Sequence, residues 1–198
     1  MERRVVITGM GVVSPVGNNL DTFWSSLIEG KSGIRPISDP ALEGYDCKIA
    51  GDVIDFDAAP FFESPKDARR ADRFSQLAMA ASTMAMDDCG IDLSAVELDR
   101  FGCMVGSGIG GLRALGDQHV NLLQKSPSRV SPFTIPMMIA NIASGMVSMK
   151  YNLRGPNMCI VTACATSNHN IGEAWRMIKF GDADVFLAGG SEATICPM

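Results

Sequence analysis

The sequence contains no CxxC pair, which is the spacing found in many zinc sites and redox motifs. Its cysteines lie mostly within apolar segments, where a reduced thiol behaves as a small core residue. The six are Cys47, Cys89, Cys103, Cys159, Cys164 and Cys196. This pattern argues against a disulfide framework or a zinc site, and we expect neither a metal nor another cofactor.

Long apolar runs are also missing. No run approaches the roughly 18 residues that a membrane-spanning helix needs. The N-terminal stretch "MERRVVITGMG" carries charge, but it lacks a long apolar core followed by a cleavage site, as a signal peptide would have. We therefore expect a cytoplasmic protein with no membrane contact.

Positive charge is in short supply. Lysine and arginine total 17 against 22 aspartates and glutamates, for a net charge of −5. A nucleic-acid partner would need a strong local basic patch to overcome this repulsion, and we expect none. Low-complexity tracts are absent and 46% of residues are hydrophobic, so the 198 residues should fold around one sizeable core.

Four apolar runs have the length of strands. They are "RVVITG" at the start, "FGCMVGSG" from Phe101, "MCIVTA" from Met158 and "DVFLAGG" from Asp184. The runs are nearly continuous rather than alternating, which is typical of strands buried on both faces of a parallel sheet covered by helices. The fold class predicted from the pattern is α/β.

Helical patterns lie between these runs. Apolar residues from Leu20 to Ile28 follow helical spacing, with Asn19 as N-cap and Gly30 to end the helix. A second helix begins at "SPKD", where Ser64 can cap it, and a third runs from about 165 to 180. The buried stripe of the second helix is Phe74, Leu77, Ala78, Ala81 and Ala85. Residues 158–189 thus predict a βαβ unit, and loops are expected at about 34–62 and at "SPSRVSPFTIPMM".

The glycine-rich stretch "GSGIGG", residues 106–111, matches the G-x-G-x-x-G pattern of dinucleotide-binding folds. Such folds also need an acidic residue about 20 residues later, and after Asp117 the next acidic residue is Glu173. Close approach of the backbone to neighbouring groups or to a ligand explains these glycines better.

Cys164 lies at the junction of a predicted strand and a predicted helix, in the stretch "IVTACATSNHNIG". This is where a nucleophile elbow exposes its reactive side chain, and the small neighbours suit such a crowded turn. The helix N-terminus favours the thiolate and offers free N–H groups to an oxyanion. On spacing alone, a structural thiol explains Cys164 about as well as a nucleophile does.

The stretch "GPNMCIVTACATSNHNIGEAWRMIKFGDADVFLAGGSEA" closely resembles the nucleophile segment of the β-ketoacyl-[acyl-carrier-protein] synthases of type II fatty-acid synthesis. "RVVITGMGVVSPVGNNLDTFW", "KSGIRPI", "KDARRADRF" and "GSGIGGL" are similar to that family in the same order, most like its synthase II branch. The resemblance covers essentially residues 1–198 and implies the N-terminal half of a thiolase-like fold, layered α/β/α/β/α. The chain also stops after a strand and a Gly-Gly turn, so we expect Met198 to be a cut, with the C-terminal half absent.

The resemblance implies a ping-pong reaction in which Cys164 accepts an acyl group from a carrier-protein thioester. Decarboxylated malonyl-carrier protein then attacks it to give a 3-oxoacyl product. The resemblance also assigns Ile109 and Phe133 to the acyl pocket, where either could equally be a packing residue. Two histidines of the family's C-terminal half assist decarboxylation, and neither His119 nor His169 is placed to replace them, because helical rotation turns His169 away from Cys164. We therefore expect the isolated chain not to condense.

Four basic residues, Lys66, Arg69, Arg70 and Arg73, have the spacing of one helical face. The resemblance supports docking of the acidic acyl carrier protein here, with Lys125 and Arg129 as a second contribution. An ordinary solvated helix face is the alternative.

The resemblance further implies a homodimeric acyltransferase of lipid metabolism. A polyketide ketosynthase shares the same motifs and differs in substrate. A non-catalytic carrier-binding or dimerisation module is the reading from a different class, if the gene ends at residue 198.

Overall fold

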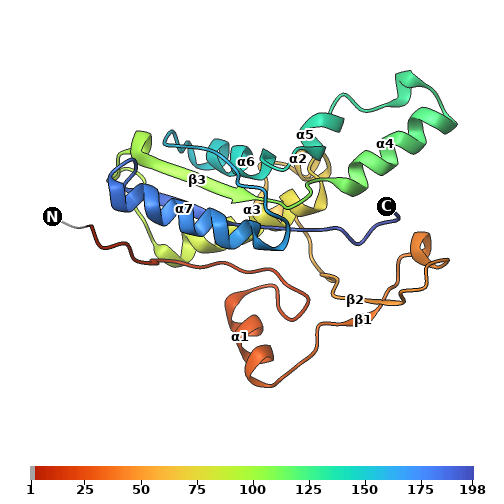
Figure 1. The fold of residues 1–198 in the computed structure, drawn as a ribbon, viewed down its shortest axis with the longest axis horizontal. Helices are drawn as coiled ribbons and strands as arrows, with labels where there is room; N and C mark the ends of the chain where they lie inside the picture. The colour runs from red at the N-terminus through yellow and green to blue at the C-terminus, as the bar shows by residue number, and fades with distance from the viewer. Residues whose placement is uncertain (1–2) are drawn as a thin grey trace.

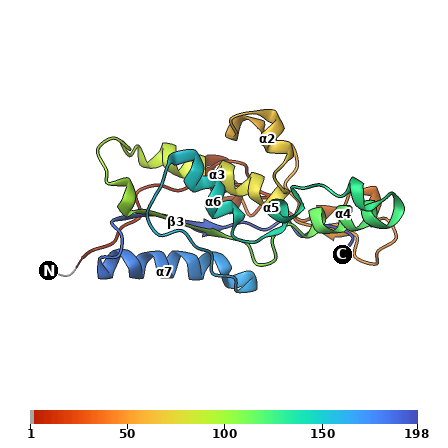
Figure 2. The ribbon, with the colours of Figure 1, turned by 90° about the horizontal axis from the view of Figure 1, so that it is seen from above.

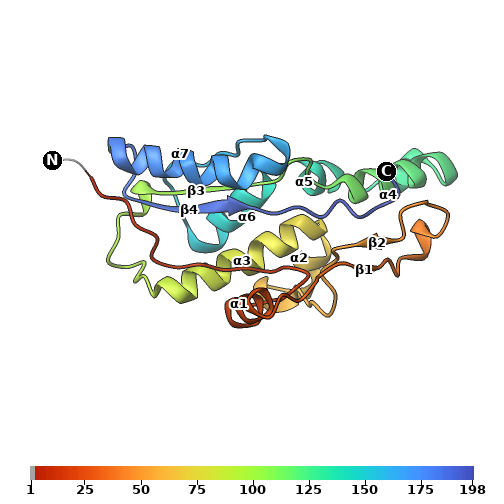
Figure 3. The ribbon, with the colours of Figure 1, turned by 60° about the horizontal axis from the view of Figure 1, so that its bottom comes forward.

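The computed structural model describes residues 3–198, and it places a small parallel sheet between layers of helices (Figure 1). Strands β3 (Phe101–Gly106) and β4 (Val185–Gly190) form this sheet. Helix α7 (Thr166–Phe180) covers one face, and α3 (Arg73–Cys89) and α6 (Ile142–Tyr151) cover the other (Figures 2 and 3). This layering confirms the predicted α/β class.

Strands β3 and β4 confirm two of the four predicted strands. They pair in parallel, from Phe101 opposite Val185 to Gly106 opposite Gly190. All six residues of β3 are buried, because helices cover both faces of the sheet and β3 lies between β4 and the segment around Asn157. The core beneath it is centred on Phe74, Phe101 and Val147.

The other two predicted strands are not strands in the structure. Residues 3–8 join no sheet among the described residues, and Val6 and Ile7 are 60% and 78% exposed. The chain after them lies directly on α3, where a Cβ on Gly11 would be 1.9 Å from the Ala81 carbonyl oxygen. Backbone that packs on a helix has no ladder of N–H and C=O groups to pair with.

The segment 158–162 runs beside β3 but leaves it early. Only Asn157 bridges to Cys103, and the Met158 N–H donates to the Cys103 carbonyl at 3.3 Å. The Ile160 N–H donates instead to the Asn170 side chain on α7. The prediction of a strand from Met158, the first strand of the βαβ unit, is therefore wrong. The Ile160 N–H is bonded to the Asn170 side chain and not to a neighbouring strand.

Helix α1 (Leu20–Ile28) forms where the pattern predicts it. The Asn19 side chain accepts from the Thr22 N–H, and Gly30 has a left-handed φ of +68° just past the end. The apolar stripe of α1 is largely exposed to solvent in the structure, with Trp24 63% exposed.

The predicted second helix is broken in two. Helix α2 (Pro65–Arg69) is capped by Ser64, and α3 begins after a new cap at Asp72. Asp72 is buried and accepts from the N–H groups of Phe74 and Ala114, so one carboxylate caps α3 and also receives the start of α4 (Leu112–Gln124). In an unbroken helix the Phe74 N–H would be bonded to the Arg70 carbonyl and would not be free for the Asp72 side chain. Within the predicted stripe, Phe74, Leu77 and Ala78 are buried, while Ala81 and Ala85 are half-buried.

The remaining elements are short. The predicted loop 34–62 contains a hairpin of β1 (Arg35–Pro36) and β2 (Ile49–Ala50), and "SPSRVSPFTIPMM" contains α5 (Thr134–Met138). Single 3₁₀ turns occupy Pro40–Leu42, Ala59–Phe61, Leu98–Arg100, Pro127–Arg129 and Ala163–Ala165. Helix α1 and the hairpin lie to one side of the layered core (Figure 1).

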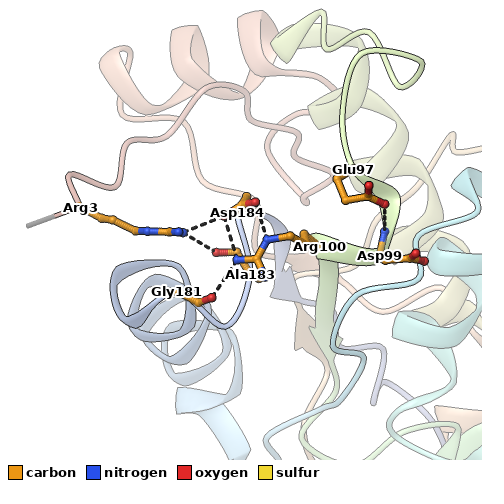
Figure 4. A network of polar contacts seen from close by, with 7 residues as sticks. All are labelled: Arg3, Glu97, Asp99, Arg100, Gly181, Ala183 and Asp184. Carbon is orange, nitrogen blue, oxygen red and sulfur yellow. Dashed lines mark hydrogen bonds and ion pairs between the residues drawn. The ribbon is translucent and has the colours of Figure 1, made fainter. Parts of the chain in front are cut away.

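A polar network ties the N-terminal segment to the start of β4 (Figure 4). Asp184 accepts from Arg3 at 2.7 Å and from Arg100 at 2.6 Å, and Arg100 also donates to the Gly181 carbonyl that ends α7. These two guanidinium groups hold the pKa of Asp184 well below its ordinary value. The network thus joins residue 3 to the α7–β4 connection.

No helix within residues 3–198 is long and apolar enough to cross a membrane. The same residues contain no cluster of three or more His, Cys, Asp or Glu side chains that could hold a metal ion.

Candidate active site

Cys164 is exposed at a sharp turn between the extended segment 158–162 and α7. The turn is one round of 3₁₀ helix, Ala163–Ala165, closed by a hydrogen bond from the Ala165 N–H to the Thr162 carbonyl at 3.1 Å. Ala163 has a left-handed φ of +52°, which a residue with a Cβ adopts only under constraint. No side chain caps the first turn of α7. The exposed thiol at a turn before a helix is therefore present as predicted, whereas the segment before it is extended chain and not a strand.

Hydrogen bonds from α7 hold this turn. The Thr162 N–H donates to the Thr166 hydroxyl at 2.9 Å, and the Thr162 hydroxyl is bonded to Nδ1 of His169 at 2.7 Å. The His169 ring therefore lies beside the elbow. Helical rotation alone predicts that it faces away, and that prediction is wrong. One ring nitrogen is occupied with Thr162, which is consistent with a local structural role.

Asn170 is a site residue that the sequence analysis missed. It is fully buried, its Oδ1 accepts from the Ile160 N–H at 2.8 Å, and its Nδ2 donates to the Gly189 carbonyl at 3.1 Å. It therefore fixes the segment before Cys164 against the end of β4. An asparagine on the inward face of a helix, which must find partners there, is the signal that could have identified it.

The glycine loop 106–111 lies against the elbow. A Cβ on Gly106 would be 2.4 Å from the Cys159 sulfur, and one on Gly108 would be 3.0 Å from Cα of Ala163. Gly110 has a φ of +82°. Close approach of the backbone to neighbouring groups, as predicted from the sequence, accounts for Gly106 and Gly108.

The other cysteines have different surroundings. Burial raises the pKa of the Cys103 and Cys159 thiols, which favours their neutral form. Cys47 is exposed, as Cys164 is, but it lies near the β1–β2 hairpin, where its thiol donates to the Ile49 carbonyl.

Of the two predicted acyl-pocket residues, Ile109 follows Gly108 in the loop beside the elbow and is 56% exposed. Phe133 lies at the start of α5, where the Arg70 guanidinium sits 4.4 Å from its ring centroid. The structure thus places Ile109 next to the Cys164 turn and joins Phe133 to the predicted docking surface.

The predicted four-residue basic face is reduced to three residues by the break after α2. Lys66, Arg69 and Arg70 are exposed. Arg73 belongs to α3 and turns inward, donating to the Val53 carbonyl at 3.0 Å, and burial lowers the pKa of its guanidinium. Lys125 ends α4 with its ammonium on Asn121, and Arg129 lies in the following turn; both are exposed.

The sequence of this chain is similar to known proteins over nearly its whole length. Residues 2–198 match the family model described as the N-terminal domain of β-ketoacyl synthase. The chain is 45% identical over 197 residues to 3-oxoacyl-[acyl-carrier-protein] synthase 2 of Synechocystis sp. and 46% identical to that of Coxiella burnetii. All of the chain is covered in both cases, and it spans about half the length of these curated relatives, at 47%.

A solved structure gives the same result for the fold. The chain superposes with a TM-score of 0.85 and 27% identity on AntDE:AntF, a type II PKS acyl-carrier protein in complex with its ketosynthase bound to the hexaketide. The match covers 100% of this chain and 47% of the other. From its sequence match and its fold, this chain belongs to the β-ketoacyl synthase family and corresponds to that family's N-terminal domain.

Proposed function

We propose that this chain is the nucleophile-bearing part of a 3-oxoacyl-[acyl-carrier-protein] synthase of fatty-acid synthesis. The observation that carries the proposal is the exposed Cys164 at a constrained turn directly before α7. The 45–46% identity to synthase 2 proteins supports the reaction and the carrier-bound substrate.

In this proposal the Cys164 thiolate attacks the carbonyl carbon of an acyl thioester. A new C–S bond forms to Cys164, the bond to the carrier's sulfur breaks, and the carrier leaves as a thiolate that takes a proton from water. The N–H of Cys164 itself lies at the turn and is our candidate donor to the oxyanion. We assign decarboxylation to residues outside this chain, because His169 is bonded to Thr162 and His119 is exposed on α4.

Mass spectrometry after incubation with an acyl-carrier-protein thioester, or with the covalent inhibitor cerulenin, tests the assignment. We expect one adduct on Cys164, none on Cys164→Ala, and an unchanged adduct on Cys47→Ala, which removes the other exposed thiol. An acyl adduct that persists in Cys164→Ala would refute the assignment.

The carrier partner is proposed for the surface of α2. Lys66 and Arg69 are exposed, and a basic patch on a protein of net charge −5 would orient an acidic carrier more than it would add affinity. Arg70 also covers Phe133, so its replacement would disturb two features at once. Lys125 and Arg129 are proposed as a second contribution.

The double variant Lys66→Glu/Arg69→Glu in the full-length protein separates docking from chemistry. We expect a raised apparent KM for the carrier-bound substrate and little change with a carrier-free thioester. Lys31→Glu, on the exposed lysine paired with Glu29 after α1, is the matched control. Equal losses with both substrates would count against docking.

A polyketide ketosynthase is the second candidate, supported by the superposition on AntDE:AntF. The higher identity to synthase 2 proteins favours fatty acyl substrates. Competition between a saturated acyl thioester and a 3-oxoacyl thioester for Cys164 separates the two. A non-catalytic module, the third reading, predicts no acylation by either.

We also propose that the full-length protein is a cytoplasmic homodimer. Exposed apolar residues beside the elbow and on α7, among them Val161, Ile171 and Trp175, support burial by further protein. Sedimentation of the full-length protein as a monomer would remove the dimer from the proposal.

A further inference from the structure

Glu192, just after β4, uses both of its carboxylate oxygens on the glycine loop. Oε1 accepts from the Ser107 hydroxyl at 2.8 Å, and Oε2 accepts from the Gly108 N–H at 2.8 Å. Ser107 is 1% exposed, and its Oγ in turn accepts from the Gly110 N–H at 2.9 Å. One carboxylate therefore holds Ser107 and Gly108 directly, and it holds Gly110 through the Ser107 hydroxyl.

The loop that Glu192 holds is the loop that packs on the Cys164 turn. A Cβ on Gly108 would lie 2.7 Å from Oε2 of Glu192 and 3.0 Å from both Cα and O of Ala163. Gly108 is thus held between the carboxylate and the residue that precedes Cys164. Ala163 is also the residue with the left-handed φ of +52°.

A second contact brings the end of β4 to the same place. The Ser191 N–H donates to the Gly106 carbonyl at 2.9 Å, and the Ser191 hydroxyl donates to the Phe74 carbonyl in the core at 2.7 Å. Glu192 is therefore attached to the rigid part of the molecule. Loops are otherwise among the more mobile parts of a fold, so this anchoring limits how far the glycine loop can move from the elbow.

We propose that Glu192 is a positioning residue for the Cys164 elbow and for Ile109, which follows Gly108 in the held loop. This inference rests on the proposed acyl transfer to Cys164. Glu192 acts through the loop. It keeps Gly108 against Ala163, so that the position of the Ile109 side chain relative to the Cys164 thiol stays fixed. Displacement of reacting groups by about 1 Å can slow a reaction roughly a hundredfold, so a loosened loop should be visible in the acylation rate.

The test compares Glu192→Ala, Glu192→Gln and wild type in the full-length protein. The readouts are the acylation rate of Cys164 with a short and a long acyl thioester, and alkylation of Cys164 and Cys47 by iodoacetamide. Glu192→Gln keeps the side-chain shape and one acceptor, so it should fall between the other two. Glu173→Ala is the matched control, because that carboxylate pairs with Arg176 within α7 and forms no hydrogen bond or ion pair with the glycine loop among residues 3–198.

For Glu192→Ala we expect acylation to slow at least about tenfold. The ratio of long-chain to short-chain rates should change at least threefold, while alkylation of both cysteines stays within about twofold. A purely structural role would instead change both thioesters by the same factor, or change Cys47 together with Cys164, and either result would overturn the inference. If Glu192→Ala does not fold, wild-type rates and an unchanged chain-length ratio in Glu192→Gln overturn it equally.

Failure of the proposed function gives a different result. Wild type that is not acylated at Cys164 refutes the proposed acyl transfer, and the inference falls with it. Wild type that is acylated, together with a Glu192→Ala variant that is acylated at the same rate and with the same ratio, refutes the inference alone.

Discussion

Residues 101–106 and residues 5–10 are both short apolar runs, "FGCMVG" and "VVITGM". The first is strand β3, with Cys103 and Met104 fully buried. The second is extended chain that belongs to no described sheet, with Ile7 78% exposed. Strand propensity describes a residue's fit to a half-buried pleated surface, and the surface itself must come from neighbouring chain.

The same contrast separates two helices. Helix α3 buries Phe74 completely, whereas α1, with an equally regular apolar stripe, leaves Trp24 63% exposed. The layered core around β3 and β4 thus carries the packing of the described structure. The N-terminal region is attached to it at a few points, among them the Arg3–Asp184 pair and the close approach of Gly11 to α3.

The largest expected effect is the loss of stability when an aromatic side chain is removed from α3, compared with the same change in α1. Phe74→Ala should lower the free energy of unfolding by about 3–5 kcal/mol, because it leaves a cavity in a fully packed core. Trp24→Ala should change it by less than about 0.5 kcal/mol. Urea unfolding of both variants measures the difference. Similar losses would mean that α1 is packed as tightly as α3.

An intermediate effect is expected from two glycines. Gly11→Ala places a Cβ 1.9 Å from the Ala81 carbonyl oxygen and should cost about 1–3 kcal/mol as the N-terminal segment moves off α3. Gly145→Ala is the matched control within α6, where a Cβ meets nothing within 4 Å. It should stabilise by up to about 1 kcal/mol, because alanine is the better helix former. Thermal unfolding that ranks the two in the opposite order would contradict the packing described.

The smallest expected effect is in the pH dependence of stability, where two aspartates should act in opposite directions. Burial raises the pKa of Asp72. The stability that this side chain contributes is therefore complete below its ordinary pKa of 3.8 and is lost as the pH rises through the raised pKa. The pKa of Asp184 is lowered by Arg100 and Arg3, so its contribution is present above 3.8 and is lost as the pH falls.

Chemical unfolding of Asp72→Asn and Asp184→Asn between about pH 2 and 7 tests these signs. Relative to wild type, Asp72→Asn should gain stability as the pH rises, whereas Asp184→Asn should lose it. The Asp184 effect should shrink in high salt, because its side chain is 46% exposed and solvent and ions screen the pairs. Slopes of the same sign in the two variants would contradict the assignment.

Much of the fold was predictable because the signals are local. The Asn19 cap and Gly30 bound α1, and Gly181, with a φ of +91°, ends α7 where the sequence predicts it. The exposed Cys164 turn was also predictable, because a strand-like run, small residues and a helix adjoin one another within a few positions. The roles proposed for Ile109, Phe133 and the basic residues remain predictions.

Contacts between distant segments were not predictable from local pattern. The partners of Asn170 on Ile160 and Gly189, and those of Glu192 on the glycine loop, join positions that are 10 to 85 residues apart. The break between α2 and α3 has the same origin, because Asp72 also accepts from Ala114 on α4. Helical spacing could not reveal this hydrogen bond of Asp72. It therefore predicted Arg73 on the exposed basic face, whereas in the structure the Arg73 side chain is half-buried.

The amino-acid sequence by itself determined where α1 and α7 begin and end, which runs are apolar, and that one thiol stands before a helix. Those properties depend on neighbours within about one or two helical turns. The tertiary structure alone decided which apolar runs became strands, which faces were covered, and what holds the Cys164 turn in place. Each of these needs a hydrogen-bonding or packing partner supplied by a remote part of the chain, and no local pattern encodes that partner.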